Sequence, residues 1–352
     1  MWYSYNLNLL KKNEIKNFTK DFENVMINLL DDKLDIFENC LSEFKTEDFG
    51  ILLKDLRIEY LKLTKEKKKK FRKIFINNYQ IERILKKEIK IYTYLELGIL
   101  CGEEIKRSTK ELSIYMYEKL KGTAKFKDEY IGPLEYYKEL KNKGVLKDIC
   151  PFCGEKIFED GSTDRRETYD HYIPKAKYPF IALHYYNLIP MCHGCNSGYK
   201  GTKNILDYMK IFDPFDDNLG KNELTIKKIL ILNGGKSTIQ NLKITNDLKK
   251  SNEIYTWDKI FKVKQRSKKI ISSSYDEILY ELSLEVESGL STEDELKGYL
   301  KRKIKLKQKF RYSKSNLFEE SLYKYFYNSI DKYKKILKIS WLYKENKIIY
   351  SP

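Results

Sequence analysis

The chain has 352 residues, of which 41% are hydrophobic and 14% aromatic, and its formal net charge is +17. That apolar content excludes a largely disordered chain, and the length allows one large domain or two to three smaller ones. No segment approaches the ~18 to 20 apolar residues of a membrane span. The positive charge indicates a polyanionic partner, but AT-rich coding would also give a composition rich in Lys, Ile, Asn and Tyr. The motifs must therefore decide the function.

Residues 1–147 are predicted to form a helical N-terminal region that binds a partner or regulates the chain. Three segments have apolar residues at three- and four-residue spacing and predict helices: Leu10–Leu30, Asp48–Leu63 and Ile81–Ile91. No proline precedes Pro133, which permits long helices. The densest positive charge, over Lys65–Lys73, is typical of a solvated helix face, and a phosphate-contacting patch is the alternative.

The sequence becomes loop-rich between Pro133 and Pro214, where six of the seven prolines lie. Such irregular sequence has little to hold it together except a metal ion or a neighbouring domain. We predict that residues 148–218 form a separate core.

Residues 219–352 are predicted to form a β-hairpin followed by a basic helical C-terminal region. The two strands, Leu224–Leu232 and Thr238–Ile244, are joined by a strong turn signal, Asn233-Gly234-Gly235. Three helices are predicted after it: Tyr275–Val286, Thr292–Arg311 and Leu317–Leu337.

The helix after Thr292 has its own start signal, because Thr292 and Glu295 make a capping box. Leu296, Leu300 and Ile304 mark its buried stripe, and its other faces are almost purely basic with aromatics between the charges. Such a helix suits a nucleic-acid backbone. A helix that is merely kept soluble by its charge is the alternative.

Four of the six cysteines lie in two Cys-x-x-Cys pairs, Cys150 with Cys153 and Cys192 with Cys195. The N-terminus has no basic segment followed by an apolar stretch, so we expect a cytoplasmic protein in which such pairs bind metal or act as redox groups. Two pairs that flank one segment favour metal. Four thiolates can surround Zn²⁺ tetrahedrally, and this closed site leaves no open position for water. The sequence therefore predicts a structural zinc.

Between the two pairs lies Asp170-His171. A neutral imidazole can accept a proton from water, and a carboxylate beside it can hold a hard cation such as Mg²⁺ or Mn²⁺. Asn196, directly after the second pair, offers a carbonyl oxygen to the same ion. A zinc ion that joins the two pairs would bring Asn196 towards Asp170.

At this point the sequence resembles the HNH, or ββα-metal, nucleases, and among them those of bacterial defence systems against phage. The motifs that carry the resemblance are DHYIPKAKYP at Asp170–Pro179, NLIPMC at Asn187–Cys192, the following Cys195-Asn196, and FDPF at Phe212–Phe215. They span about residues 148–218. The expected fold is mainly α with a small α+β insert: a ββα-metal core with a four-cysteine zinc site, between helical N- and C-terminal regions.

The resemblance also implies roles for individual residues. His171 would be the general base, and Asp170 and Asn196 would hold the catalytic Mg²⁺ or Mn²⁺. Asn187 would brace the loop between the two β-strands. Cleavage of DNA would leave 5′-phosphate and 3′-hydroxyl ends. Asn196 stands where many members carry the final histidine, a replacement that also occurs in active members of the Asp-His type.

The expected partners are DNA and a regulatory protein, because a toxic nuclease needs restraint. The partner could be an ATPase of the same defence system, since the chain has no P-loop signature and any such activity must come from elsewhere. An RNase and a non-catalytic zinc-containing nucleic-acid-binding protein are the alternatives. The basic residues that flank the site and are predicted to contact phosphates are Arg165, Arg166, Lys175, Lys200 and Lys203. Of the other histidines, His184 either faces substrate or packs beneath the strand, and His193 is expected to be exposed or beside the zinc ligands.

Overall fold

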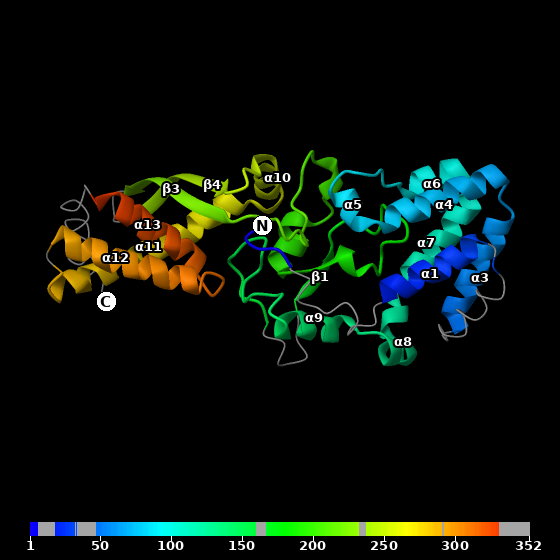
Figure 1. Cartoon of the computed structure of the whole chain (residues 1–352), viewed down its shortest axis with the longest axis horizontal. Helices are drawn as coiled ribbons and strands as arrows, with labels where there is room; N and C mark the ends of the chain where they lie inside the picture. Colours follow the sequence, from blue (N-terminus) through cyan, green and yellow to red (C-terminus); the bar gives the residue numbers. More distant parts are fainter. Residues whose placement is uncertain are drawn as a thin grey trace. The chain divides into compact units, whose positions relative to one another are not determined.

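The computed structural model describes residues 1–5, 18–31, 33, 47–159, 167–231, 237–290 and 292–330. They are mainly helical, as predicted, and contain two small antiparallel sheets of two strands each (Figure 1). They divide into two compact units: the helical unit, residues 5–146 and 159–216, and the hairpin unit, residues 1–4, 147–158 and 217 onward. Among these described residues, no helix is both long and apolar enough to cross a bilayer.

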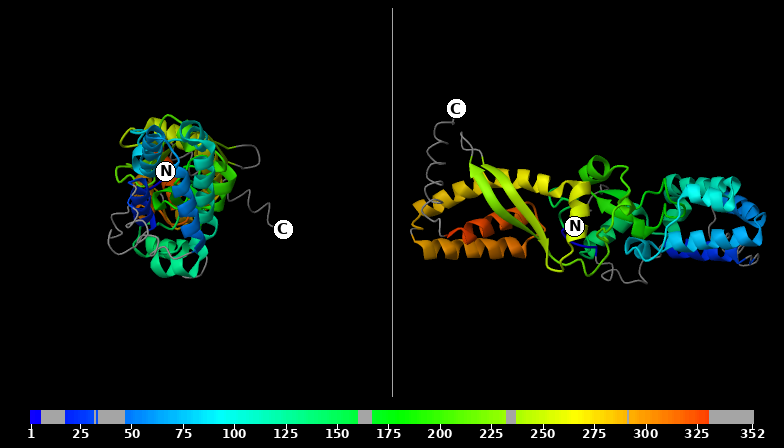
Figure 2. Two further views of the ribbon diagram at one scale, coloured as in Figure 1. Left: turned by 90° about the vertical axis from the view of Figure 1, so that its right-hand side faces the viewer. Right: turned by 90° about the horizontal axis from the view of Figure 1, so that it is seen from above.

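The helical unit begins with α1 (Phe18–Leu30), α3 (Glu47–Leu61), α4 (Lys65–Tyr79), α5 (Ile81–Leu85), α6 (Tyr94–Cys101), α7 (Glu103–Glu118), α8 (Ala124–Glu129) and α9 (Pro133–Asn142). Helix α7 packs against α3 and α6, and α4 packs against α6 and α1 (Figures 1 and 2). Aromatic side chains fill the core between them; for example, the Phe75 ring meets the Phe180 ring edge-on with centroids 5.2 Å apart.

Helix α4 explains the basic run at residues 65–73. The Thr64 side chain caps its first turn by accepting the Lys67 N–H, and Phe71, Ile74 and Phe75 form its buried face. Lys69 and Lys73 are exposed on the opposite face, and Lys65 and Lys67 are exposed in the first turn. The run is therefore a solvated face of an amphipathic helix.

The helix predicted over residues 81–91 is wrong beyond Leu85, where α5 ends. The Asn78 side chain on α4 forms two hydrogen bonds with the backbone of Tyr92. Its amide nitrogen donates to the Tyr92 carbonyl, and its amide oxygen accepts the Tyr92 N–H, each at 2.8 Å. Lys87 between them has a left-handed backbone, φ 62°. Hydrogen bonds from another element therefore override the helical pattern of this segment.

The second part of the helical unit contains β1 (Thr168–His171) and β2 (Leu188–Met191), which pair antiparallel with Asp170 opposite Ile189. Three short helical segments belong to the same part: η3 (Tyr185–Asn187), the π-helix η4 (Gly194–Lys200) and η5 (Ile205–Asp207). Since η4 begins three residues after β2 and packs against β1, the order along the chain is strand, strand, helix.

The hairpin unit contains β3 (Asn222–Ile231) and β4 (Ser237–Asn246), followed by α10 (Ser251–Phe261), α11 (Val263–Glu287), α12 (Glu293–Lys309) and α13 (Asn316–Asn328). The predicted hairpin is confirmed, although its turn lies outside the described residues. Helix α11 packs against β4, and α13 packs against β3, α11 and α12 (Figure 2). The N-terminal Trp2 is buried in this unit, with its ring edge-on to Trp257.

Candidate functional site

The first cysteine pair lies on a small hairpin loop of residues 149–157. The Cys150 N–H donates to the Lys156 carbonyl at 2.9 Å, and the Glu155 N–H points at the Cys153 sulfur at 3.4 Å. The turn needs Gly154, whose φ is +72° and whose added Cβ would lie 2.6 Å from the Trp2 indole nitrogen. Backbone N–H groups that face sulfur in this way offset the negative charge of a thiolate.

The second pair follows β2. Cys192 comes directly after the strand, and the Asn196 N–H donates to its carbonyl at 2.9 Å, which turns the chain into η4. Cys195 lies in the first turn of η4 and is buried.

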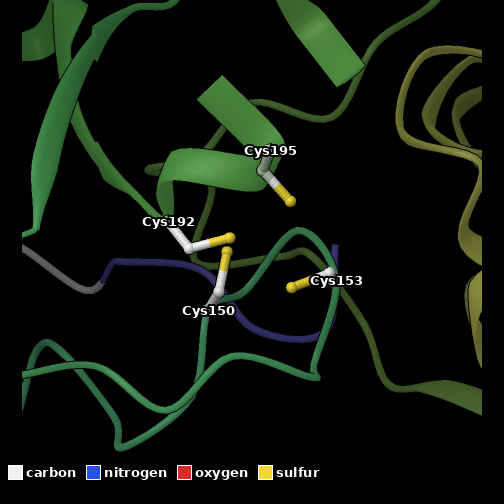
Figure 3. A group of neighbouring side chains, drawn as sticks. All are labelled: Cys150, Cys153, Cys192 and Cys195. Carbon is white, nitrogen blue, oxygen red and sulfur yellow. The ribbon is translucent and has the colours of Figure 1, made fainter. Parts of the chain in front are cut away.

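The four predicted zinc ligands come together. All four cysteines are buried, and their sulfur atoms lie within 4.8 Å of one another and point towards a common centre (Figure 3). A tetrahedral site with Zn–S bonds of about 2.3 Å has sulfur–sulfur edges of about 3.8 Å, so a small contraction of the group would accommodate the ion. The arrangement therefore fits the predicted structural zinc.

The face of β1 towards η4 carries Thr168 and Asp170, two residues apart as strand alternation requires. The Lys200 ammonium lies 3.1 Å from Oδ1 and 2.9 Å from Oδ2 of Asp170. It also donates to the His171 carbonyl at 3.0 Å. The Asn196 amide donates to the Thr168 hydroxyl at 3.1 Å. Asn196 and Lys200 of η4 thus hold the two alternate residues of β1.

Asp170 and Lys200 form a buried ion pair, with side chains only 6% and 2% exposed. Burial raises the pKa of the Asp170 carboxyl, and the Lys200 ammonium opposes that shift. Lys200, predicted to contact phosphate at the surface, is instead enclosed in this pair. In this arrangement Lys200 occupies the carboxylate that was predicted to bind a cation, and the Asn196 amide nitrogen donates to Thr168.

His171 ends β1 and has different neighbours from Asp170. Its Nε2 lies 2.9 Å from the Ala182 carbonyl oxygen. Since a carbonyl can only accept, Nε2 carries the proton and Nδ1 keeps the basic lone pair. Burial, opposed by the hydrogen bond to the Ala182 carbonyl and assisted by the nearby lysine ammonium groups, lowers the pKa of His171 to about 3. The ring is therefore neutral at physiological pH.

Helix α7 and the short 3-10 helix η2 (Leu120–Gly122) that follows it each supply one residue that was not predicted from the sequence. The Tyr117 ring meets the His171 ring edge-on, with centroids 4.5 Å apart. The Lys121 and Lys175 ammonium groups lie 3.6 and 3.0 Å from the Tyr117 ring centroid. Burial and the neighbouring Lys121 charge lower the pKa of Lys175 to about 8. A cationic cluster thus adjoins the imidazole, and of its lysines the sequence had indicated Lys175 but not Lys121.

Asn187 holds the connection between β1 and β2. Its side chain is fully buried, accepts the Ile173 N–H at 2.7 Å and donates to the Ile173 carbonyl at 3.0 Å. A further hydrogen bond reaches the Ile181 carbonyl at 3.3 Å. These contacts fix the loop whose Ala182 carbonyl orients His171.

The remaining candidates have other surroundings. His184 is buried against Tyr79, with ring centroids 4.6 Å apart, and its Nδ1 has no hydrogen-bond partner among the described residues. His193 is exposed. The exposed Lys203 donates to the Tyr199 carbonyl. Arg165 and Arg166 lie outside the described residues.

Comparisons with known proteins do not show which family this chain belongs to. No protein-family model matches the chain, and no solved structure matches it. One similar curated protein is "Protein ea31" of Escherichia phage lambda, which is 36% identical over 58 residues. That segment is 16% of this chain and spans only 17% of the phage protein.

Proposed function

We propose that the chain is an endonuclease of the HNH type that hydrolyses phosphodiester bonds of DNA. The observation that carries the proposal is the setting of His171. Its Nε2 is fixed on the Ala182 carbonyl, which leaves Nδ1 as a proton acceptor in a neutral ring. The cationic cluster of Lys121 and Lys175 beside it suits a phosphate group.

In this proposal, Nδ1 of His171 takes a proton from water as the water oxygen attacks phosphorus. The bond from phosphorus to the 3′ oxygen breaks and the departing oxygen takes a proton from solvent water, so the products carry a 5′-phosphate and a 3′-hydroxyl. Lys121 and Lys175 balance the charge that grows on the non-bridging oxygens. Tyr117 and the Ala182 carbonyl keep the imidazole in its working orientation.

The proposal includes a catalytic Mg²⁺ or Mn²⁺ on the oxygens of Asp170 and Asn196, which are hard donors of the kind these ions prefer. The ion would stabilise negative charge on the departing oxygen. For it to bind, Lys200 must release the Asp170 carboxylate, whereas the Asn196 oxygen can bind the ion while the amide nitrogen stays on Thr168.

Plasmid DNA and a structured RNA, each incubated with Mg²⁺ or Mn²⁺ and with a chelator, test this function. We expect the wild type to cut DNA only with the cation, and His171→Ala to lose at least about a hundredfold in rate. His193→Ala removes an exposed imidazole and is the matched control. Intact DNA under all conditions, or cleavage by His171→Ala at the wild-type rate, contradicts the proposal. Cleavage of RNA alone would identify the alternative RNase.

The resemblance to defence nucleases also leads us to propose a role against phage, with a regulatory partner such as an ATPase. Affinity purification from the source cells, followed by mass spectrometry, tests this. An associated ATPase is the expected result, and its absence before and during infection contradicts the proposal.

A further inference from the structure

A basic groove of about 470 Å³ lies in the hairpin unit where α10 meets α11 beside β4. Its lining includes four lysines, Lys259, Lys262, Lys264 and Lys268, and one carboxylate, Asp258. The groove therefore carries an excess of three positive charges. The catalytic residues proposed above belong to the helical unit, so this groove is a separate feature.

The carboxylate of the lining is engaged with Lys264 and leaves the other three lysine charges of the groove in excess. Asp258 accepts the Lys264 N–H at 2.8 Å and lies 3.6 Å from the Lys264 ammonium. The Lys268 ammonium donates to the Gln240 carbonyl at 2.7 Å, which holds this charge at the β4 side. Lys262 is exposed, and among the described residues no carboxylate pairs with it. Its charge is available to an anion from solution.

The β4 side of the groove offers amide groups because of an irregularity in the hairpin. The register shifts around Lys228, which pairs with Asn241, while Ile229 pairs with Ile239. Strict alternation would bury one of two successive residues, but here Gln240 and Asn241 are both exposed. Both line the groove and can hydrogen-bond to a polar ligand.

The α10 side offers an aromatic ring. Tyr255 lines the groove and is 63% exposed, with the Lys259 ammonium 5.8 Å from its ring centroid. An exposed ring beside lysines and amides is the combination that binds single-stranded nucleic acid, because unpaired bases stack on the ring while phosphates meet the ammonium groups. Bases within a duplex are already paired and stacked, and they cannot use such a ring.

We propose that this groove binds single-stranded nucleic acid, with phosphates at Lys262 and its neighbours and an unpaired base on Tyr255. Binding here does not require phosphodiester cleavage. It would hold a strand on the chain whether or not the helical unit cuts it.

The test measures binding of a fluorescein-labelled oligothymidylate to the full chain by fluorescence anisotropy, at several salt concentrations. His171→Ala is present in every protein, so that cleavage does not interfere. Lys262→Gly removes the exposed charge without strain, because Lys262 has a left-handed φ of 53° that glycine adopts freely. Lys249→Gly is the matched control: Lys249 is exposed, has φ 56° and does not line the groove.

We expect Lys262→Gly to weaken binding severalfold and to reduce the slope of log affinity against log salt by about 0.7, the contribution of one phosphate contact. Lys249→Gly should leave the slope unchanged. Tyr255→Ala should weaken binding about tenfold with little change in slope, and Tyr255→Phe should retain it. Tyr280→Ala, which removes another exposed tyrosine outside the groove, is the control for the ring.

Three results overturn the proposal. Equal losses in Lys262→Gly and Lys249→Gly show that only net charge matters. Unchanged binding in Tyr255→Ala removes the role of the ring. Displacement of the oligothymidylate by polyglutamate as readily as by unlabelled strand identifies an acidic protein as the occupant. Failure of the cleavage test would not affect these binding measurements, because every protein in them carries His171→Ala.

Discussion

The Lys200 ammonium lies within 3.1 Å of both oxygens of the buried Asp170 carboxylate. Lys200→Met keeps much of the side-chain volume but leaves the carboxylate buried without its partner. We expect the free energy of unfolding to fall by about 3 kcal/mol, the usual cost of breaking a buried pair from one side. Urea denaturation measures this. Lys203→Met, an exposed lysine three residues later, should change stability by less than about 0.5 kcal/mol.

The same substitution tests the competition between Lys200 and a divalent cation. If Mn²⁺ binds Asp170, it replaces the lost positive charge, and we expect Mn²⁺ to raise the melting temperature of Lys200→Met more than that of the wild type. Differential scanning fluorimetry with and without Mn²⁺ gives the comparison. An equal Mn²⁺ effect on both proteins would show that the ion does not bind Asp170.

Asn187 satisfies polar groups of the β1–β2 connection that water does not reach. Asn187→Ala leaves the Ile173 N–H and carbonyl without these hydrogen bonds, so we expect a loss of about 3 kcal/mol in unfolding free energy. Asn187→Asp should also destabilise, because a carboxylate cannot donate to the Ile173 and Ile181 carbonyls. Asn252→Ala, on the exposed face of α10, is the control. Wild-type stability in Asn187→Ala would show that the loop is held by other contacts.

At the scale of elements, the sequence predicted correctly a feature that depends only on residues close together in the chain. The capping box before α12 is present: Thr292 accepts the Glu295 N–H, and Glu295 accepts the Thr292 N–H. We expect Thr292→Ala to cost about 1 kcal/mol. Thermal unfolding followed by circular dichroism measures the loss, and Thr292→Ser should recover most of it. If Thr292→Ser is no more stable than Thr292→Ala, the cap contributes nothing.

Elements that depend on distant partners were predicted less well. Helix α11 begins at Val263, well before the predicted Tyr275. The prediction missed this part because its buried face includes Ser267 and Ser274, and small polar residues interrupt a hydrophobic pattern. The same limit applies to the candidate site: the motif contained His171 and Asp170, but nothing local to it indicated Tyr117, which comes from α7.

At the scale of the whole molecule, the four cysteines are the part of the candidate site that spacing alone predicted in full. Two Cys-x-x-Cys pairs specify a zinc site through ligand chemistry, which does not depend on neighbouring side chains. Lys200 shows the opposite case. Its charge indicated a surface residue, and only the packing of η4 on β1 reveals that it is buried with Asp170.

Zinc should therefore be a condition for folding around the cysteines, because the binding energy of a structural metal is folding energy. We expect Cys150→Ser to lose zinc, measured by elemental analysis after dialysis, and to exchange amide hydrogens faster in residues 148–158 and 192–200. Cys101→Ser, which changes a buried thiol outside the group, should keep its zinc. His171→Ala should also keep zinc and remain folded, which separates the structural metal from the chemistry. Full zinc occupancy in Cys150→Ser would contradict the four-cysteine site, whatever the outcome of the cleavage assay.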